Sequence, residues 1–125
     1  MCGIVGLFLK TPSLEPELGR LAASMLREMR DRGPDSAGFA VYGAAEPRAK
    51  LVALGADDTD WAGLARDLGA ALGADGEAAP LGDHAVIRVA GDGEAARRWI
   101  IETRPDLAVL SLGRSIEVFK GVGDP

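Results

Sequence analysis

The chain opens with an almost continuous apolar run and then changes to a helical pattern. Residues 2–9 carry apolar or small side chains at every position, which is typical of a strand covered on both faces. Residues 14–31 place apolar side chains three and four positions apart, so that they form one stripe on a helix, with the members Leu18, Leu21, Ala22, Met25, Leu26 and Met29. We therefore predict a buried strand over 2–9 and a helix over 14–31 whose stripe packs in a core.

The rest of the chain alternates between short strand-like runs and helical runs. We predict strands at 37–42, 49–54, 84–90 and 107–112. We predict helices at 58–72 and 93–103. The small residues of 74–80 predict a loop, and 43–47 predicts a turn that joins the first two of these strands as a hairpin. From residue 49 onward, the order strand, helix, strand, helix, strand is that of a split βαβ unit of ferredoxin-like type.

Length, charge and cysteine content exclude several classes of protein. A chain of 125 residues is long enough to bury one core. Its net charge of -5 argues against a nucleic-acid surface, which is expected to be basic. A single cysteine permits no internal disulfide and cannot hold an iron–sulfur cluster. No membrane span or secretory signal is recognisable, so we expect a cytoplasmic chain with no membrane partner. We also expect no metal and no cofactor.

Three short features are interpreted as structural rather than functional. The Gly91-Asp92-Gly93 sequence lacks the rest of a phosphate-binding motif and predicts a strand-to-helix turn. Asp57, Asp58 and Asp60 favour the start of a helix through its dipole. His84, the one histidine, has no second metal ligand nearby in the sequence and is expected at a cap or on the surface.

Cys2 directly follows Met1 and is the candidate with chemical meaning. Removing Met1 would leave a thiol and a free α-amine on the same residue. An α-amine has a pKa of about 7.7–8.0 and a thiol about 8.5, so the two can exchange a proton near neutrality. An N-terminal amine can thus act as the base for its own nucleophile. Free cysteines are also common core residues, and position alone does not separate these two readings.

A second motif follows the predicted helix, namely Arg30-Asp31-Arg32-Gly33-Pro34-Asp35-Ser36-Ala37-Gly38. Taken alone, Gly-Pro-Asp is ordinary turn chemistry. Together with Met-Cys-Gly-Ile-Val-Gly at residues 1–6, it resembles the opening of class II glutamine amidotransferase domains, which belong to the N-terminal nucleophile (Ntn) hydrolases. The resemblance implies an α+β fold, the N-terminal part of a four-layer αββα sandwich.

The same resemblance implies an enzyme and a role for three residues. Cys2 would attack the side-chain amide of glutamine with its own α-amine as base, form a thioester and release ammonia, and water would then release glutamate. Arg32 and Gly33 would support the site by holding the N-terminal amine and the loop around it. The family's Asn-Gly oxyanion pair and its His-Thr-Arg stretch have no counterpart, and the chain contains no asparagine. We therefore expect an incomplete domain that hydrolyses glutamine poorly or not at all by itself.

The resemblance divides the chain into three regions. Residues 1–48 would begin the Ntn domain, 49–120 would form an inserted ferredoxin-like α/β subdomain, and 121–125 would link to a missing remainder. In the alternative that stays open, the second region belongs to the main sheets.

A weaker match concerns the partners. Residues 104–120 resemble amidotransferase subunits of glutamate-synthase-like systems, including the N-methylglutamate synthase type, which implies synthase subunits that accept the ammonia. Homo-oligomerisation is left open. The competing interpretation is a non-catalytic α/β scaffold or partner-binding module that keeps an Ntn-like start. The Arg-Gly-Pro-Asp turn disfavours a peptidase of the same fold group.

Overall fold

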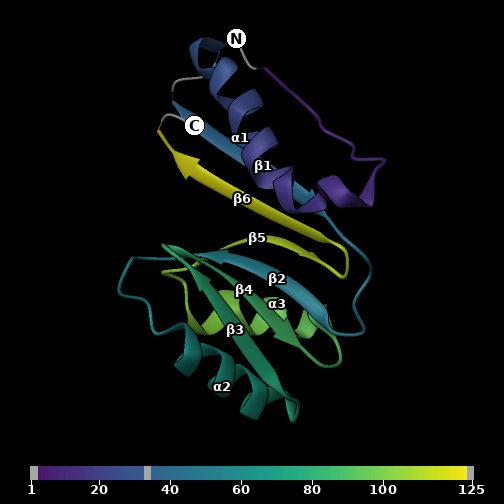
Figure 1. Cartoon of the computed structure of the whole chain (residues 1–125). Helices are drawn as coiled ribbons and strands as arrows, with labels where there is room; N and C mark the ends of the chain where they lie inside the picture. Colours follow the sequence, from purple (N-terminus) through teal and green to yellow (C-terminus); the bar gives the residue numbers. More distant parts are fainter. Residues whose placement is uncertain (1–2, 33–34, 124–125) are drawn as a thin grey trace. The chain divides into compact units, whose positions relative to one another are not determined.

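The structure is a computed structural model that describes residues 3–32 and 35–123. It confirms the α+β class, with helices and two antiparallel sheets (Figure 1). The helical elements are η1 (Pro12–Glu17), α1 (Leu18–Glu28), η2 (Arg30–Arg32), α2 (Trp61–Leu72) and α3 (Gly93–Thr103), where η marks a 3-10 helix. The strands are β1 (Ser36–Tyr42), β2 (Ala49–Leu54), β3 (Gly76–Leu81), β4 (His84–Val89), β5 (Ala108–Gly113) and β6 (Ile116–Val122).

The chain forms two compact units, which are described separately. Unit 1 consists of Met1–Gly38 with Lys120–Pro125, and unit 2 is Phe39–Phe119. Strands β1 and β6 pair as a two-stranded sheet. The helix α1 lies beside η1 and η2 in unit 1.

Unit 2 is a four-stranded antiparallel sheet with the strand order β3-β4-β2-β5. Along the chain its elements run β2-α2-β3-β4-α3-β5, which is the β-α-β-β-α-β order of the ferredoxin-like split βαβ arrangement. Helices α2 and α3 lie on the same side of the sheet (Figure 1). The predicted order from residue 49 onward is therefore correct except that it lacked β3.

The core of unit 2 follows from the two-residue period of its strands. In β2, Ala49, Leu51 and Ala53 belong to a cluster with both helices, whereas Val52 belongs to a second cluster with Val86 and Phe119, because successive strand residues point to opposite faces. The largest fully buried side chains of the helix-facing cluster are Leu51, Leu68, Ile87, Ile100 and Val89. Each contributes about 1.5–3 kcal/mol by leaving water.

Aspartate caps fix where the two helices begin. Asp60 Oδ1 accepts a hydrogen bond from Gly63 N at 2.9 Å. Asp92 Oδ1 accepts from Glu94 N at 2.9 Å and from Ala95 N at 3.3 Å. These bonds satisfy backbone donors that a helix leaves free in its first turn. Gly91 has a φ of 100°, which a residue with a side chain rarely adopts, so the predicted strand-to-helix turn is confirmed.

Several predicted elements agree with the structure within a few residues. The strands predicted at 37–42, 49–54, 84–90 and 107–112 correspond to β1, β2, β4 and β5, and the helices at 58–72 and 93–103 to α2 and α3. The helix predicted at 14–31 is α-helical only over Leu18–Glu28, since Pro16 lies inside the preceding 3-10 helix. Its apolar stripe is covered only in part, and no residue of α1 is buried.

The predicted strand over residues 2–9 is wrong for the described part, 3–9, which belongs to neither a strand nor a helix. A buried strand needs a partner on its edge and cover on its faces, and the described residues supply neither. The hairpin across 43–47 is also wrong, because β1 pairs with β6 and β2 pairs with β4 and β5. Gly43 N and Glu46 N instead donate to Ser115 O and Arg114 O, at the turn between β5 and β6.

The predicted loop over 74–80 is wrong as well, since Gly76–Leu81 forms the edge strand β3. The small residues that suggested a loop are required by close packing of β3 on α2. A Cβ on Gly76 would overlap the backbone carbonyl oxygen of Ala65 in α2 and lie 3.2 Å from its carbonyl carbon. Strand β6 was not predicted.

Replacing Gly76 by alanine tests this close approach. We expect Gly76→Ala to lower the free energy of unfolding by about 1–3 kcal/mol, the usual cost of overpacking, because backbone atoms cannot move aside cheaply. Gly43→Ala is the matched control, since no atom lies within 4 Å of its added Cβ. Urea unfolding followed by circular dichroism measures both variants. Equal stabilities would show that β3 does not lie against α2.

Candidate functional site

The residues predicted to form the site are Cys2, Arg32 and Gly33, of which Cys2 and Gly33 lie outside the described residues. Arg32 ends η2 and is exposed. Its backbone N donates to Met29 O at 2.9 Å, which closes the turn that follows α1. The position of Arg32 is therefore set by the end of the first helical segment.

Gly3, the neighbour of Cys2 in sequence, packs directly against this turn. A Cβ on Gly3 would overlap the Met29 side-chain methyl carbon and lie 3.2 Å from Arg32 Cδ and 3.4 Å from Arg32 Cβ. The overlapping atom is the far end of the flexible Met29 side chain, so these distances show that Gly3 lies close to Met29 and Arg32. The structure thus brings the residue that follows Cys2 against the residue that precedes Gly33, although about thirty positions separate them in sequence.

The described residues that follow position 34 are tied to the C-terminal strand. Asp35 O accepts a hydrogen bond from Gly123 N at 3.0 Å, and Ser36 begins β1, which pairs with β6.

A second cluster of polar side chains, which sequence reasoning missed, lies in unit 2 on the sheet face opposite the helices. Lys50 in β2 and Arg88 in β4 are directly paired across the sheet, and like charges in that relation repel. Two carboxylates compensate them. Arg88 donates to both oxygens of Glu46, at 2.9 and 3.4 Å, and Lys50 Nζ donates to Glu117 Oε1 at 3.0 Å. Lys50 Nζ also lies 3.3 Å from Glu46 Oε1.

Protonation in this ionic cluster is set by burial and by its hydrogen bonds. The hydrogen bonds from Arg88 and then Lys50 hold the pKa of Glu46 below its ordinary value, although desolvation opposes them. Burial disfavours the Lys50 charge, since the residue is 4% exposed, but the bonds to Glu117 and Glu46 outweigh it and raise the pKa of Lys50. The pKa of Arg88 is also raised, mainly by its hydrogen bond to Glu46. Lys50 and Arg88 are each paired with a carboxylate, and the bond between Lys50 and Glu117 joins β6 to β2.

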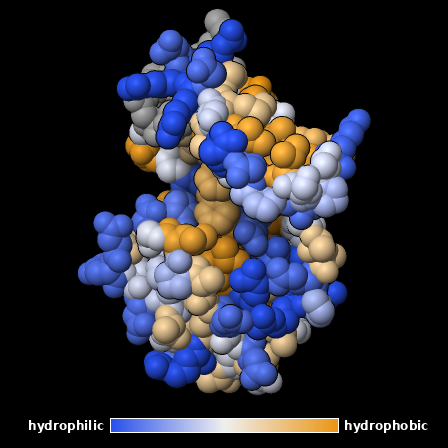
Figure 2. All heavy atoms as spheres, viewed as in Figure 1, coloured by the Kyte–Doolittle hydropathy of each residue, from blue (hydrophilic) through white to orange (hydrophobic). Residues whose placement is uncertain are grey.

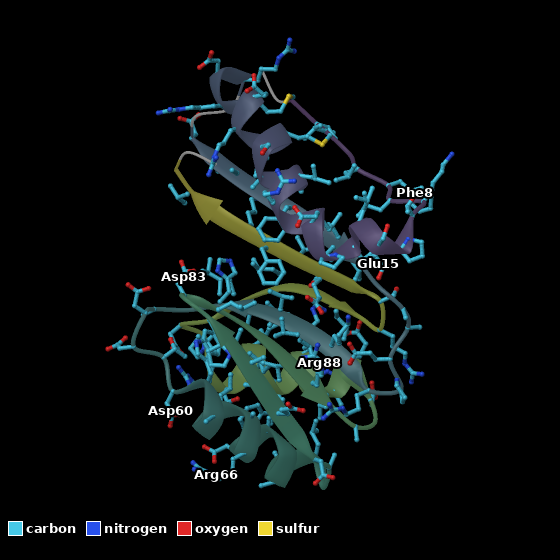
Figure 3. All side chains as sticks on the ribbon, in the orientation of Figure 1. Phe8, Glu15, Asp60, Arg66, Asp83 and Arg88 are labelled. Carbon is cyan, nitrogen blue, oxygen red and sulfur yellow. The ribbon has the colours of Figure 1, made fainter. Side chains whose placement is uncertain are left out.

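A sequence signal for this cluster existed in the strands themselves. Lys50 and Arg88 each interrupt a run of apolar residues, in Ala-Lys-Leu-Val-Ala-Leu and in Ala-Val-Ile-Arg-Val respectively. Charged residues in the middle of an interior strand are seldom buried without a partner. The partners themselves come from outside these two strands and were not predictable without the fold. Figure 3 shows Arg88 on the sheet of unit 2.

Other candidate positions have structural roles. His84 Nδ1 lies 2.6 Å from Asp83 Oδ1, and its ring is 5.7 Å from that of Phe119. Its side chain is largely buried, so the expected surface position is wrong. Among the described residues, no group of three or more His, Cys, Asp or Glu side chains is arranged to hold a metal ion. No helix in the described part has the length and apolar character that crossing a membrane requires.

An open hollow of about 750 Å³ lies between the end of α2 and the start of α3. Its lining is mostly glycine and alanine, with Asp75 and Asp92 as the charged members. Asp92 is already engaged as the cap of α3. The hollow therefore offers neither a nucleophile nor a free cation to a substrate.

Comparison with known proteins gives one informative match. The chain is 47% identical over 128 residues to the glutamine amidotransferase-like protein GlxB of Rhizobium meliloti (strain 1021). The match takes in the whole chain but only 42% of the relative, so the chain spans less than half the length of that protein. No family model and no solved structure matches the chain. The similarity supports a glutamine amidotransferase-like family.

The ionic cluster predicts a pH dependence of stability. Because the pKa of Glu46 is lowered in the folded chain, its contribution is complete above its ordinary value of 4.5 and is lost as the pH falls through the folded value. Glu46→Gln removes this contribution, so we expect its stability to fall less steeply than that of the unsubstituted chain between about pH 5 and 3. Urea unfolding across this range measures it.

The control for this experiment is Glu94→Gln, which removes a carboxylate from an exposed ion pair with Arg97. Exposed pairs of this kind contribute little to stability. Parallel pH profiles for Glu46→Gln and the unsubstituted chain would show that Arg88 and Lys50 do not favour the Glu46 carboxylate in the fold.

Proposed function

We propose that this chain carries the nucleophile of a class II, Ntn-type glutamine amidotransferase. Two lines of argument support the proposal. The chain pairs the Met-Cys-Gly-Ile-Val-Gly opening with the Arg-Gly-Pro-Asp turn, and its relative GlxB is named glutamine amidotransferase-like.

The observation that carries the proposal is the contact between Gly3 and Arg32. It supports the proposal because Gly3, which follows Cys2 in sequence, lies close to Arg32, which precedes Gly33. A nucleophile and its supporting loop must be held in one geometry, because small displacements of reacting groups cost rate.

The proposed reaction uses one residue as nucleophile and base. After removal of Met1, the α-amine of Cys2 accepts the thiol proton as sulfur attacks the side-chain amide carbon of glutamine. The tetrahedral intermediate collapses, the C–N bond breaks, and the amine returns the proton to the departing ammonia. Water then adds to the thioester carbon, the C–S bond breaks, and glutamate leaves with the thiol restored. Arg32 and Gly33 act as supports of the amine and its loop.

The reaction also needs groups that this sequence does not supply in the family's usual form. Donors to the developing oxyanion are worth about 2.7–4 kcal/mol of barrier in other enzymes, and the usual asparagine donor is absent. We propose that such groups come from outside these residues, and that separate synthase subunits take up the ammonia.

The absence of asparagine also favours a second candidate, a non-catalytic α/β scaffold that keeps the Ntn-like start. The two candidates differ in one chemical requirement. The enzyme needs a free Cys2 amine and thiol, whereas the scaffold needs neither.

Labelling of Cys2 separates the two candidates. We expect intact mass to show loss of Met1 and, after treatment with 6-diazo-5-oxo-norleucine, a single adduct that peptide mapping assigns to Cys2. Cys2→Ser is the control and should take up no adduct, because the hydroxyl is a far weaker nucleophile than the thiol. Retention of Met1, or an unlabelled Cys2 in a folded and processed chain, would favour the scaffold.

The Gly3 contact generates a second labelling prediction. Gly3→Ala puts a methyl group into the Met29 and Arg32 side chains, so we expect the rate of Cys2 labelling to fall roughly 10- to 100-fold through misplacement of the nucleophile. Gly6→Ala is the matched control, because its added Cβ has no atom within 4 Å. If both variants label at the unsubstituted rate, the contact does not support the reactive geometry.

A further inference from the structure

Met29 closes the first helical segment, and hydrogen bonds fix its backbone on both sides. Its N–H donates to Leu26 O at 3.0 Å, and its carbonyl oxygen accepts from Arg32 N at 2.9 Å. Its φ of -91° and ψ of -1° keep it in the right-handed helical region. The point from which the half-buried Met29 side chain leaves the helix is therefore well defined.

The tip of this side chain lies against Gly3. A Cβ on Gly3 would overlap the Met29 methyl carbon and lie 3.2 Å from Arg32 Cδ. The bond from Arg32 N to Met29 O spans three positions, as in a 3-10 turn, where side chains three positions apart point the same way. The Met29 methyl group and the aliphatic stem of Arg32 thus form one surface, which we call the Gly3 seat.

The contact at the Gly3 seat is apolar on both sides. Residues 3–9 carry no charge, and Met29 is the last member of the apolar stripe of α1. Figure 2 shows apolar side chains on the face of unit 1 that carries the N-terminal segment and α1. A methionine side chain is unbranched and has three rotatable bonds, so it can follow the irregular surface of a backbone. Such contact weakens steeply once a gap of 0.5–1 Å opens.

A contact at Gly3 acts on Cys2 because a single peptide bond joins the two residues. The proposed reaction needs the thiol and the α-amine of Cys2 in one orientation, and a displacement of about 1 Å can cost roughly 100-fold in rate. We propose that Met29 is a positioning residue for Cys2, and that it acts through its contact with Gly3. This inference rests on the proposed function, since it concerns the same nucleophile.

Nuclear magnetic resonance tests the contact without any reaction. The chain has three methionines, so loss of Met1 leaves two signals in a chain labelled at its methionine methyl groups. The Met29 methyl group should show a nuclear Overhauser effect to the Gly3 α protons. In Met29→Ala, the amide order parameter of Gly3 should fall from about 0.85 to below about 0.6.

Met25→Ala is the matched control. It removes the same kind of side chain from the same stripe, and no Met25 atom is among the three nearest to an added Gly3 Cβ. We expect Met25→Ala to leave the Gly3 order parameter at the value of the unsubstituted chain. Absence of the Met29–Gly3 effect, or equal loss of order in the two alanine variants, would overturn the proposal.

Labelling kinetics test the consequence for Cys2. The rate constant at saturating 6-diazo-5-oxo-norleucine reports the reactive geometry, whereas the half-saturating concentration reports binding. We expect Met29→Ala to lower the saturating rate constant roughly tenfold or more, with the half-saturating concentration unchanged within about threefold. Met29→Leu should restore the rate constant to within about threefold of the unsubstituted chain, because swaps that conserve volume are tolerated best.

Loss of folding would give a different result, since it lowers the fraction of chains that become labelled rather than the rate constant. Equal rate constants for Met29→Ala and the unsubstituted chain, or an equal fall in Met25→Ala, would overturn the positioning role and leave the proposed reaction intact. If Met29 orders Gly3 but Cys2 in the processed chain takes up no label, the proposed reaction fails and the contact stands.

The two proposals can therefore fail independently.

Discussion

The burial of one face of β2 and β4 beneath α2 and α3 is the interaction on which the described fold depends. Leu51 and Ile87 are fully buried on this face, against Leu68 and Ile100 of the helices. Strand alternation then sends Lys50, Val52, Val86 and Arg88 to the other face. That second face has to be covered as well, and Phe119 and Glu117 of β6 meet its apolar and charged parts respectively.

The charged residues on this face restrict how β2 and β4 can pair. Lys50 and Arg88 stand opposite each other, so the pairing of β2 with β4 is acceptable only with carboxylates between them. Glu46 arrives from the segment before β2, and Glu117 arrives from β6. The same strand β6 pairs with β1, and Gly123 N beyond it donates to Asp35 O.

The two units differ in how completely their own residues bury apolar side chains and pair polar groups. Unit 2 has its caps, its core and its ion pairs within its own boundaries. Unit 1 has close local packing, such as that of Gly3 on Arg32, but leaves large apolar side chains in solvent.

The elements that local pattern determines were predicted from the sequence. Helix α3 and strand β2 have the predicted bounds. The helix is determined locally by its amphipathic period and its aspartate cap. The strand is determined locally by a short apolar run. The two motifs likewise indicated which residues belong to the proposed site, and the packing of Gly3 on Arg32 is compatible with that grouping.

Only the tertiary structure decided which strands pair and which apolar runs are covered. The small residues 74–80 suggested a loop, yet Gly76 allows β3 to lie against α2, a contact that no local pattern contains. Residues 3–9 have the composition of a buried strand but no partner among the described residues. Composition determines the tendency to be buried, while burial itself requires a surface supplied from elsewhere in the fold.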